Sequence, residues 1–383
     1  MINIGIDQAS IIAQIKIVHD IGDWIIKSNS VISNVESALS LEAIFGCKRE
    51  SNAPAPYSVG IEFGYHDFYF RVAFHPSNPK TGIMIKFSAH ALEYYRVRFK
   101  ELFAKEIDLN RILQTLDTID AIIDPCNGPL FSDVTYRCSR IDVYIDYIDE
   151  NIDITDLYIG LIQQRYTIRH ANGRKNQSKL HGRTKADKYE TFYVGNPRQR
   201  NKRSLLRVYD KKTEELANRK AFRLDTAKEC DNWIRLETEF SECYAHDLTD
   251  ALKDADSKSF HSIILNAVLE RYRFCYSDKN EYLPVTSMLL DKNIESSFSF
   301  QSRIESDPTI DRKISYMLYG SGLIPLLYVI NEVWGEEGLN YIYSLIDASR
   351  IDFIPSRKER KWLRVHKDDL AEIPLFFQDG IET

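Results

Sequence analysis

The stretch Cys138–Asp149 (CSRIDVYIDYID) constrains the fold more than any other part of this chain. One set of alternate positions is apolar and β-branched: Ile141, Val143 and Ile145. The other set is polar: Arg140, Asp142, Tyr144 and Asp146. Because successive side chains of a strand point to opposite faces, the pattern predicts a β-strand with one face in a core. Carboxylates are uncommon in strands, and such local inconsistencies concentrate at functional sites.

Two later stretches alternate in the same way. Between residues 205 and 211, one face carries Leu205, Arg207, Tyr209 and Lys211. Between residues 233 and 240, one face carries Trp233, Arg235, Glu237 and Glu239. If the three strands share one sheet with their apolar faces in the core, their polar faces coincide. Carboxylates would then lie beside a tyrosine, as in a metal-dependent site that cleaves phosphodiesters.

Tyr209 is the candidate nucleophile of such a site. Arg207 and Lys211 flank it on the same face. Two neighbouring cations would lower the cost of forming the phenolate that attacks a phosphodiester, so these three residues are the predicted catalytic groups. The alternative is a half-buried strand tyrosine whose flanking cations extend to solvent.

The carboxylates are the candidate ligands of Mg²⁺ or Mn²⁺. A strand rises roughly 3.3 Å per residue, so Asp142 and Asp146 would lie about 13 Å apart and would not share one ion. A cross-strand pair of Asp142 with Glu237 is the better expectation. Two further carboxylates are third ligands or ion-pair partners of Arg140 or Arg235: Glu239 and Asp146.

Charge is distributed unevenly along the chain. The net charge is -6, but residues 165–207 hold thirteen Lys or Arg against two acids, a local +11 that leaves -17 for the remainder. Such a segment can neutralise nucleic-acid phosphates, although a solvated basic loop is the alternative. The candidate DNA-binding residues are Arg174, Lys175, Lys179, Arg183, Arg198, Arg200, Lys202 and Arg203. Nearby aromatic residues could stack bases of an extruded hairpin or single strand: Tyr166, Tyr189 and Phe192.

Length and pattern predict an α+β protein with a largely antiparallel sheet, one polar catalytic face, flanking helices and a mainly helical C-terminal region. We expect a helical segment over residues 1–50, a catalytic domain over 51–280 and a helical region over 281–383. The expected helices are 8–29, 34–45, 89–103, 109–123, 151–165 and 212–230. The expected strands are 57–63, 68–74, 82–88, 138–149, 189–194, 205–211 and 233–240, with residues 166–188 as a loop or a β-ribbon.

Cysteine use and hydropathy bear on the compartment. The six cysteines are scattered, with no CxxC pair and no zinc-type cluster, which favours a reducing cytosol. The amino terminus lacks the pattern of a signal peptide, and the apolar stretch near 323–330 is too short to cross a bilayer. We therefore expect a cytoplasmic protein without membrane contact.

The tail contains two apolar helical patterns between residues 311 and 350, broken around Gly335–Gly338. A basic segment that includes Trp362 follows at 356–367. A DNA-recognition module, a dimerisation module and a packed helical cap all fit these features.

The motifs over residues 57–275 resemble the replication initiation factor family, the trans-acting initiators of rolling-circle plasmids with relatives in filamentous phages and conjugative elements. The matching residues are Arg140, Asp142 and Asp146 in SRIDVYIDY, Tyr193 and Gly195 in TFYVGN, Ser204, Arg207, Tyr209, Asp210 and Lys211 in SLLRVYDKK, and Arg235 and Glu237 in WIRLETEF. The resemblance implies that Tyr209 is the nicking nucleophile and that acidic residues on neighbouring strands hold a divalent metal. It also implies a homodimer that recruits a host helicase.

The leading hypothesis is therefore a sequence-specific nickase that initiates rolling-circle DNA replication through a 5′-phosphotyrosyl intermediate. A conjugative relaxase with the same chemistry is one alternative. The other is a non-catalytic DNA-binding regulator of replication or transcription, in which the carboxylates only pair with Arg140 and Arg235. Metal dependence separates the catalytic hypotheses from the regulator.

Overall fold

The structure is a computed structural model, and it describes residues 1–65, 68–88, 90–121, 123–124, 128–129, 134–185, 188–198, 203–218, 222–279, 281–292, 298–300, 317–318, 321–357, 359–360 and 363–364. The chain forms two compact units, Met1–Glu305 and Ser306–Thr383.

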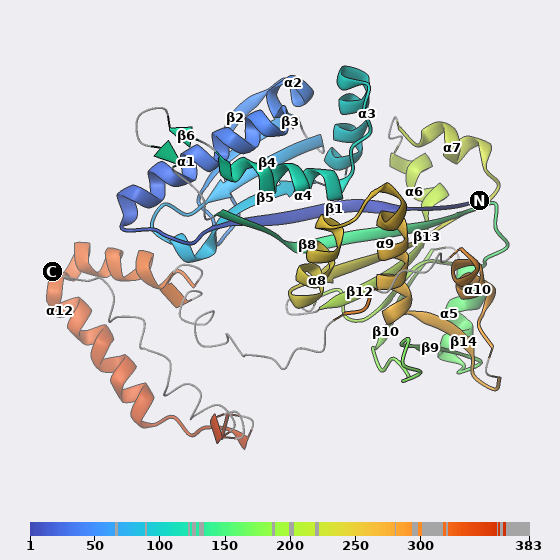
Figure 1. The fold of residues 1–383 in the computed structure, drawn as a ribbon. Coiled ribbons are helices and arrows are strands. Elements are labelled where there is room, and N and C mark those ends of the chain that lie inside the picture. Colours follow the sequence, from blue (N-terminus) through green and yellow to red (C-terminus); the bar gives the residue numbers. More distant parts are fainter. Residues whose placement is uncertain are drawn as a thin grey trace. The chain divides into compact units, whose positions relative to one another are not determined.

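A ten-stranded antiparallel sheet organises the first unit (Figure 1). From one edge to the other its strands are β10 (Leu180–Lys185), β11 (Lys188–Val194), β12 (Ser204–Asp210), β13 (Trp233–Ser241), β8 (Val134–Ile148), β1 (Ile2–Ile15), β5 (Ile83–Phe87), β4 (Phe68–Phe74), β3 (Val59–Tyr65) and β2 (Lys48–Asn52). Two small sheets pair β9 (Tyr166–Arg169) with β14 (Arg273–Tyr276) and β6 (Ile123–Asp124) with β7 (Gly128–Pro129).

The strand order repeats on the two sides of the central β1–β8 pair. One half reads β1-β5-β4-β3-β2 and the other β8-β13-β12-β11-β10. In each half a long strand is followed along the chain by four sheet strands, the last of which returns to pair beside the first. β1 and β8 pair along their whole length, from Ile2 opposite Tyr147 to Ile15 opposite Val134. The strands of Tyr209 and Glu237 thus lie in the second half of a pseudo-symmetric sheet.

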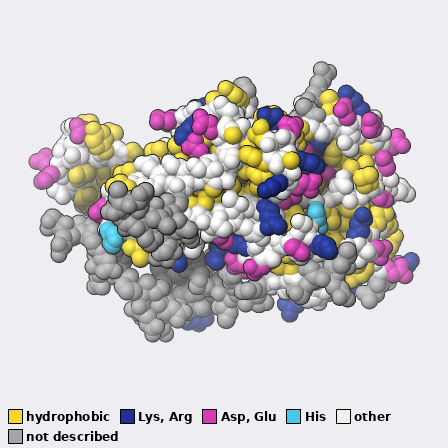
Figure 2. Space-filling view, turned by 45° about the horizontal axis from the view of Figure 1, so that its top comes forward, with side chains coloured by type: hydrophobic (Ala, Val, Ile, Leu, Met, Phe, Trp, Pro, Cys, Tyr) yellow, Lys and Arg dark blue, Asp and Glu magenta, His cyan; other side chains and the backbone are white. Residues whose placement is uncertain are grey.

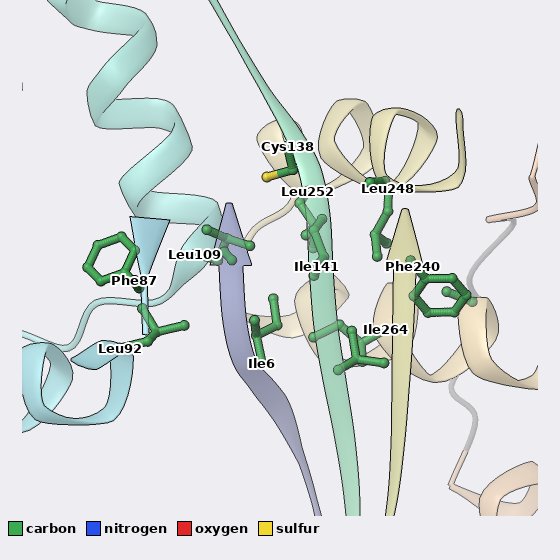
Figure 3. Packing of buried hydrophobic residues seen from close by; sticks show 14 of the residues in the cluster. Ile6, Phe87, Leu92, Leu109, Cys138, Ile141, Phe240, Leu248, Leu252 and Ile264 are labelled. Carbon is green, nitrogen blue, oxygen red and sulfur yellow. The ribbon is translucent and has the colours of Figure 1, made fainter. Parts of the chain in front are cut away.

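Helices flank the sheet. They are α1 (Ile21–Ala38), α2 (Leu41–Phe45), α3 (Ala91–Phe103), α4 (Leu109–Asp117), α5 (Ile154–Ile162), α6 (Lys211–Asn218), α7 (Leu224–Glu229), α8 (Cys243–Lys253), α9 (Ser257–Arg271) and α10 (Pro284–Asp291), with short 3₁₀ turns at Pro79–Thr81 and Thr118–Ala121. Most of them cover the apolar side of the sheet, whereas α6 and α7 lie on the polar side, where Ala227 of α7 packs with Trp233 of β13. Figure 3 shows Ile141 on β8 facing Leu252 and Ile264, which come from α8 and α9. All three are buried in one continuous core. This packing leaves the polar side chains of β8 and β13 on the other face.

The expected helix over residues 8–29 is wrong in its first half. Residues 2–15 form β1 at the centre of the sheet, and α1 begins only at Ile21, after Asp20 caps it by accepting from the Asp23 amide. Ile11, Ala13 and Ile15 are buried, which is the period of a strand. A run this rich in isoleucine suits either element, and pairing with β5 and β8 decides between them. Residues 1–50 are therefore part of the sheet unit and not a helical segment beside it.

The α+β class is confirmed, and each expected strand is present within a few residues. The expected helix at 109–123 ends at Asp117, and the one at 212–230 is divided into α6 and α7. The basic segment 166–188 forms β9 and β10, and β10 pairs with β11 as the edge of the sheet. Over the residues that the structure describes, no helix combines the length and apolar character needed to cross a membrane.

The second unit contains α12 (Leu323–Ile351), whose backbone is non-helical at Gly335, with φ 60° and ψ -152°. A positive φ is accessible to glycine without the strain of a Cβ atom. The predicted interruption near residues 335–338 is thus confirmed. Trp362 and the end of the basic segment 356–367 lie outside the described residues.

Candidate functional site

The sheet places the three predicted polar strands side by side, in the order β12-β13-β8. Between β12 and β13, Arg207 lies opposite Glu237 and Tyr209 opposite Arg235. Between β13 and β8, the register pairs Arg235 with Asp146, Glu237 with Tyr144 and Glu239 with Asp142. The polar faces therefore coincide as predicted, because all three strands turn their apolar faces to the same core.

Tyr209 and Glu237 are in direct contact at the centre of this face. The Tyr209 hydroxyl donates to Glu237 Oε2 at 3.0 Å, and Arg207 Nη2 donates to the same oxygen at 2.7 Å. The Arg207 guanidinium also lies 4.0 Å from the centre of the Tyr209 ring. Arg207 Nε is buried and has no hydrogen-bond partner in the part of the chain that the structure describes. The three side chains therefore form one interlocked group.

Neighbouring cations favour the Tyr209 phenolate as predicted, but burial outweighs their effect on the pKa of Tyr209. The side chain is only 4% exposed, and this burial raises the pKa of Tyr209 well above its usual 10, with a smaller contribution from Glu237. Arg235 and Arg207 oppose the rise without cancelling it. Burial penalises a phenolate more than these paired cations stabilise it, so the resting group is a neutral phenol.

Lys211 lies near Tyr209 but is neutralised by its own helix. It is the first residue of α6, and its Nζ forms ion pairs of 2.6 Å with both Glu214 and Glu215. The same nitrogen is 5.8 Å from the centre of the Tyr209 ring. Lys211 therefore supplies less positive charge to the phenol than its place in the sequence indicated.

Asp142 is held by an arginine two residues earlier on the same strand. Arg140 donates to both of its oxygens, at 2.7 and 2.5 Å, and also lies 3.1 Å from Glu239. Burial raises the pKa of Asp142 to about 7, and Glu237 and Glu239 add to the rise while Arg140 opposes it. The predicted cross-strand pairing of Asp142 with Glu237 is corrected by the register, which puts Glu239 opposite Asp142.

Asp146 belongs to a buried ion-pair network. Arg235, with 0% exposure, donates to both oxygens of Asp146 at 2.6 and 2.7 Å and to Asp7 at 2.9 Å. Asp7 also lies 3.8 Å from Arg223, which pairs with Glu93. Sequence reasoning missed Asp7 because the strand that carries it was partly assigned to a helix. Asp146 therefore has the structural role of partner to Arg235.

The carboxylates do not form a ready metal centre in this arrangement. Within the described ranges, no group of three or more His, Cys, Asp or Glu side chains is placed to hold one ion. Asp142 and Asp146 each have both oxygens on a guanidinium, as described above. Glu237 forms an ion pair of 2.7 Å with Arg207, and Glu239 forms an ion pair of 3.1 Å with Arg140. A divalent ion would have to displace at least one of these arginine contacts.

The predicted DNA-binding residues lie toward the β10 edge of the sheet. Arg174, Lys175 and Lys179 are exposed between β9 and β10, Arg183 is exposed on β10, and Arg198 is exposed after β11. Arg203 is half-buried just before β12. Arg200 and Lys202 lie outside the described residues. Figure 2 shows that Lys and Arg side chains are interspersed with Asp and Glu on the visible face.

Comparisons with known proteins agree with the motif resemblance. Residues 136–307 match the family described as replication initiation factor. Among solved structures, the chain is similar to the rolling circle replication initiator protein from Geobacillus stearothermophilus, with a TM-score of 0.50 and 15% identity, covering 76% of this chain and 97% of that chain. At this identity the likeness concerns the fold. A comparison with curated proteins gives no match.

The matched segment contains β8, β12 and β13, and with them Asp142, Tyr209 and Glu237. Over residues 136–307, this chain matches the replication initiation factor family, and the resemblance inferred from its motifs is confirmed.

Proposed function

We propose that this protein initiates rolling-circle DNA replication by nicking and rejoining a DNA strand, with Tyr209 as the nucleophile. The observation that carries the proposal is the hydrogen bond from Tyr209 to Glu237 on a sheet face shared with Arg207. The family match and the shared fold support the same function.

Because the Tyr209 pKa is raised, the reaction needs a group that takes the phenolic proton. Glu237 already accepts the hydrogen bond from that hydroxyl and is the base of the proposal. The Tyr209 oxygen attacks the scissile phosphorus while its proton passes to Glu237. The bond from phosphorus to the 3′-oxygen breaks, and that oxygen takes a proton from solvent. The products are a 5′-phosphotyrosyl link and a free 3′-hydroxyl that primes synthesis.

Arg207 is the group that would bind the DNA phosphate beside the buried Tyr209 phenol. Its side chain is 31% exposed, whereas the side chain of Glu237 is 15% exposed. A phosphate that binds the exposed part of the Arg207 guanidinium would compete with Glu237 for this cation. Weakening the contact from Arg207 to Glu237 makes the carboxylate a better proton acceptor. DNA binding itself would thus prepare the base.

Dependence on Mg²⁺ or Mn²⁺ remains part of the proposal, with Asp142, Glu237 and Glu239 as the candidate ligands. Such an ion would neutralise charge on the phosphate. No step above is assigned to it, because the carboxylates are engaged with arginines in this arrangement. DNA from the replication origin, as a hairpin or single strand, is the proposed partner at the β10 edge. A homodimer, a host helicase and a cytoplasmic location complete the proposal.

The test uses supercoiled DNA of the protein's own replicon, incubated with and without Mg²⁺. We expect relaxed circles and a protein–DNA adduct that survives denaturing electrophoresis, both dependent on Mg²⁺ and absent from Tyr209→Phe. The buried ion pairs of Asp142 and Asp146 favour a second candidate, a non-catalytic regulator. Specific origin binding by wild-type protein without any nicking would select that candidate.

A further inference from the structure

A cavity of about 420 Å³ lies beside the β9–β14 pair. Its lining residues come from β9, from the turn that follows β9 and from the residue after β14: Thr167, Arg169, Gly173, Lys175 and Ser277. These residues offer two cations, two hydroxyls and a glycine backbone. None of the residues named as its lining is acidic, so the cavity is suited to an anion.

The turn that shapes the cavity is fixed by its own hydrogen bonds. The His170 amide donates to Arg174 O at 2.9 Å, and the Gly173 amide donates to His170 O at 2.9 Å. Gly173 has a φ of +79°, and a Cβ atom built on it would meet nothing within 4 Å. The space beside Gly173 is therefore open, and the turn brings Lys175 opposite Arg169.

Three cations face one another across adjacent segments here. Arg169 lies opposite Lys175 on one side and opposite Arg273 of β14 on the other. Arg273 donates to two uncharged acceptors, Leu269 O at 2.9 Å and Tyr282 Oη at 3.3 Å. Positive charge therefore gathers beside the cavity, where it would attract an anion.

Thr167 supplies an independent observation that points to a ligand. Its side chain lines the cavity and is only 6% exposed. Its Oγ1 is buried and has no hydrogen-bond partner among the residues that the structure describes. Buried hydroxyls without a partner are uncommon because the lost hydrogen bonds to water are not replaced. A phosphate oxygen accepts hydrogen bonds without donating any, and would satisfy this group together with the nearby cations.

We propose that this pocket, named here the β9 pocket and formed by Thr167, Arg169, Gly173, Lys175 and Ser277, binds a backbone phosphate of the DNA substrate. The inference rests on the proposed function, because it takes the ligand from the DNA that the protein nicks. Residues 176–179 lead directly from Lys175 into β10, the edge strand that carries exposed Arg183. A strand of DNA along this edge would be anchored in the β9 pocket.

The test measures affinity of the full-length protein for a labelled single-stranded oligonucleotide over a series of salt concentrations. Lys175→Ala should weaken binding several-fold and flatten the slope of log affinity against log salt by about 0.7, the value for one phosphate contact with a single strand. Thr167→Val should weaken binding with an unchanged slope, because it removes a hydroxyl and no charge. The double variant should lose less than the product of the two effects, since both residues bind one phosphate.

The matched control is Lys105→Ala, which removes one exposed cation from the loop between α3 and α4 and does not line the cavity. Thermal unfolding checks that each variant is folded. The proposal is overturned if Thr167→Val binds like wild type and Lys175→Ala behaves like Lys105→Ala. It is also overturned if Thr167→Val weakens binding of inorganic phosphate or a nucleoside monophosphate but leaves oligonucleotide affinity unchanged, because the pocket would then serve a small phosphate ligand.

A second readout separates this inference from the proposed function. Nicking by Thr167→Val and Lys175→Ala at saturating DNA should equal that of wild type, because neither residue belongs to the Tyr209 group. A nicking rate at saturation that falls with these variants would place the pocket in catalysis and overturn its role as an anchor. If wild-type protein does not nick at all, the proposed function fails, while the oligonucleotide affinities still decide whether the pocket binds DNA.

Discussion

The hydroxyl of Tyr209 donates to Glu237 Oε2 at 3.0 Å across the β12–β13 pair, and Arg207 donates to that same oxygen. This shared acceptor links the proposed nucleophile, its proposed base and a proposed phosphate-binding cation through one atom. Burial raises the pKa of Tyr209, so the phenol is neutral in this arrangement.

Tyr209→Phe should abolish nicking and covalent attachment while DNA binding stays nearly unchanged, because the variant loses one oxygen and no charge. The lost hydrogen bond to a carboxylate should cost about 1.5–3 kcal/mol of stability. Adduct formation, anisotropy with labelled DNA and urea unfolding measure the three effects. Tyr193→Phe, opposite Arg207 on β11, is the matched control. Undiminished nicking by Tyr209→Phe would move the nucleophile to Tyr144, Tyr193 or Tyr189.

Asp142→Asn and Glu237→Gln should each weaken activation by Mn²⁺, because an amide keeps the shape of a carboxylate but loses the charge that a hard cation requires. Calorimetric titration with Mn²⁺ gives the metal affinity of each variant independently of nicking, which Glu237→Gln should also lose because it removes the proposed base. Unchanged metal affinity in both variants would leave Asp142 as a partner of Arg140, and Glu237 as the base of Tyr209 without a metal.

Asp146→Asn should instead act on stability. It removes one charge from Arg235, which is 0% exposed and would keep only Asp7 as a charged partner in its direct contacts. Breaking a buried ion pair costs about 3–5 kcal/mol, and the contact with Asp7 should keep the loss near the lower value. Urea unfolding measures it. Asp142→Asn is the comparison, because the side chain of Arg140 is 39% exposed. Equal losses in both variants would show that Asp7 compensates fully for Arg235.

Asp142 should make the protein less stable as the pH rises from about 4 to about 7. Its pKa is raised from 3.8 to about 7 in the folded state, so the folded protein binds the proton more tightly than the unfolded chain. Within that window the folded state holds more protons, and the free energy of unfolding falls with pH by up to about 1 kcal/mol per unit from this group. Asp142→Asn should remove this component of the profile. Identical profiles for wild type and the variant would show that Arg140 keeps Asp142 ionised throughout.

Replacing Arg198, Arg200, Lys202 and Arg203 together with Ala should flatten the salt dependence of DNA binding. If all four contact a single strand, the slope of log affinity against log salt changes by roughly 3. Nicking of short substrates at high concentration should survive better than binding, because none of the four belongs to the Tyr209 group. A wild-type slope would indicate that this loop is solvated surface and would favour the basic segment 356–367 as the DNA contact.

Much of the site could be predicted from sequence because the alternation of apolar and polar residues along a strand is a local property. The period of two in Cys138–Asp149 and in the strands of Tyr209 and Glu237 fixes which side chains face the core. That information needs no knowledge of which strand pairs with which. Once pairing places the three strands in one sheet, the same alternation puts Asp142, Tyr209 and Glu237 on one face.

Register and burial depend on contacts between distant parts of the chain. Glu239 lies opposite Asp142 only because β13 and β8 pair with that offset, and a shift of two residues would have kept the same faces. The repeated strand order likewise depends on β1, whose isoleucines suit a helix or a strand until β8 and β5 pair with it. Asp7 joined the Arg235 network through the same pairing.

By itself, then, the sequence determined the three polar strands, which face of each carries the polar side chains, and the residues that match the replication initiation factor family. The tertiary structure decided which of those polar groups are already engaged. Arg140 forms an ion pair with Asp142, Arg235 forms an ion pair with Asp146, and the buried Tyr209 donates a hydrogen bond to Glu237. The physical reason is that the alternation along one strand specifies the face of the sheet to which each side chain points. Ion pairs and desolvation depend instead on side chains from neighbouring strands, at distances of a few ångströms.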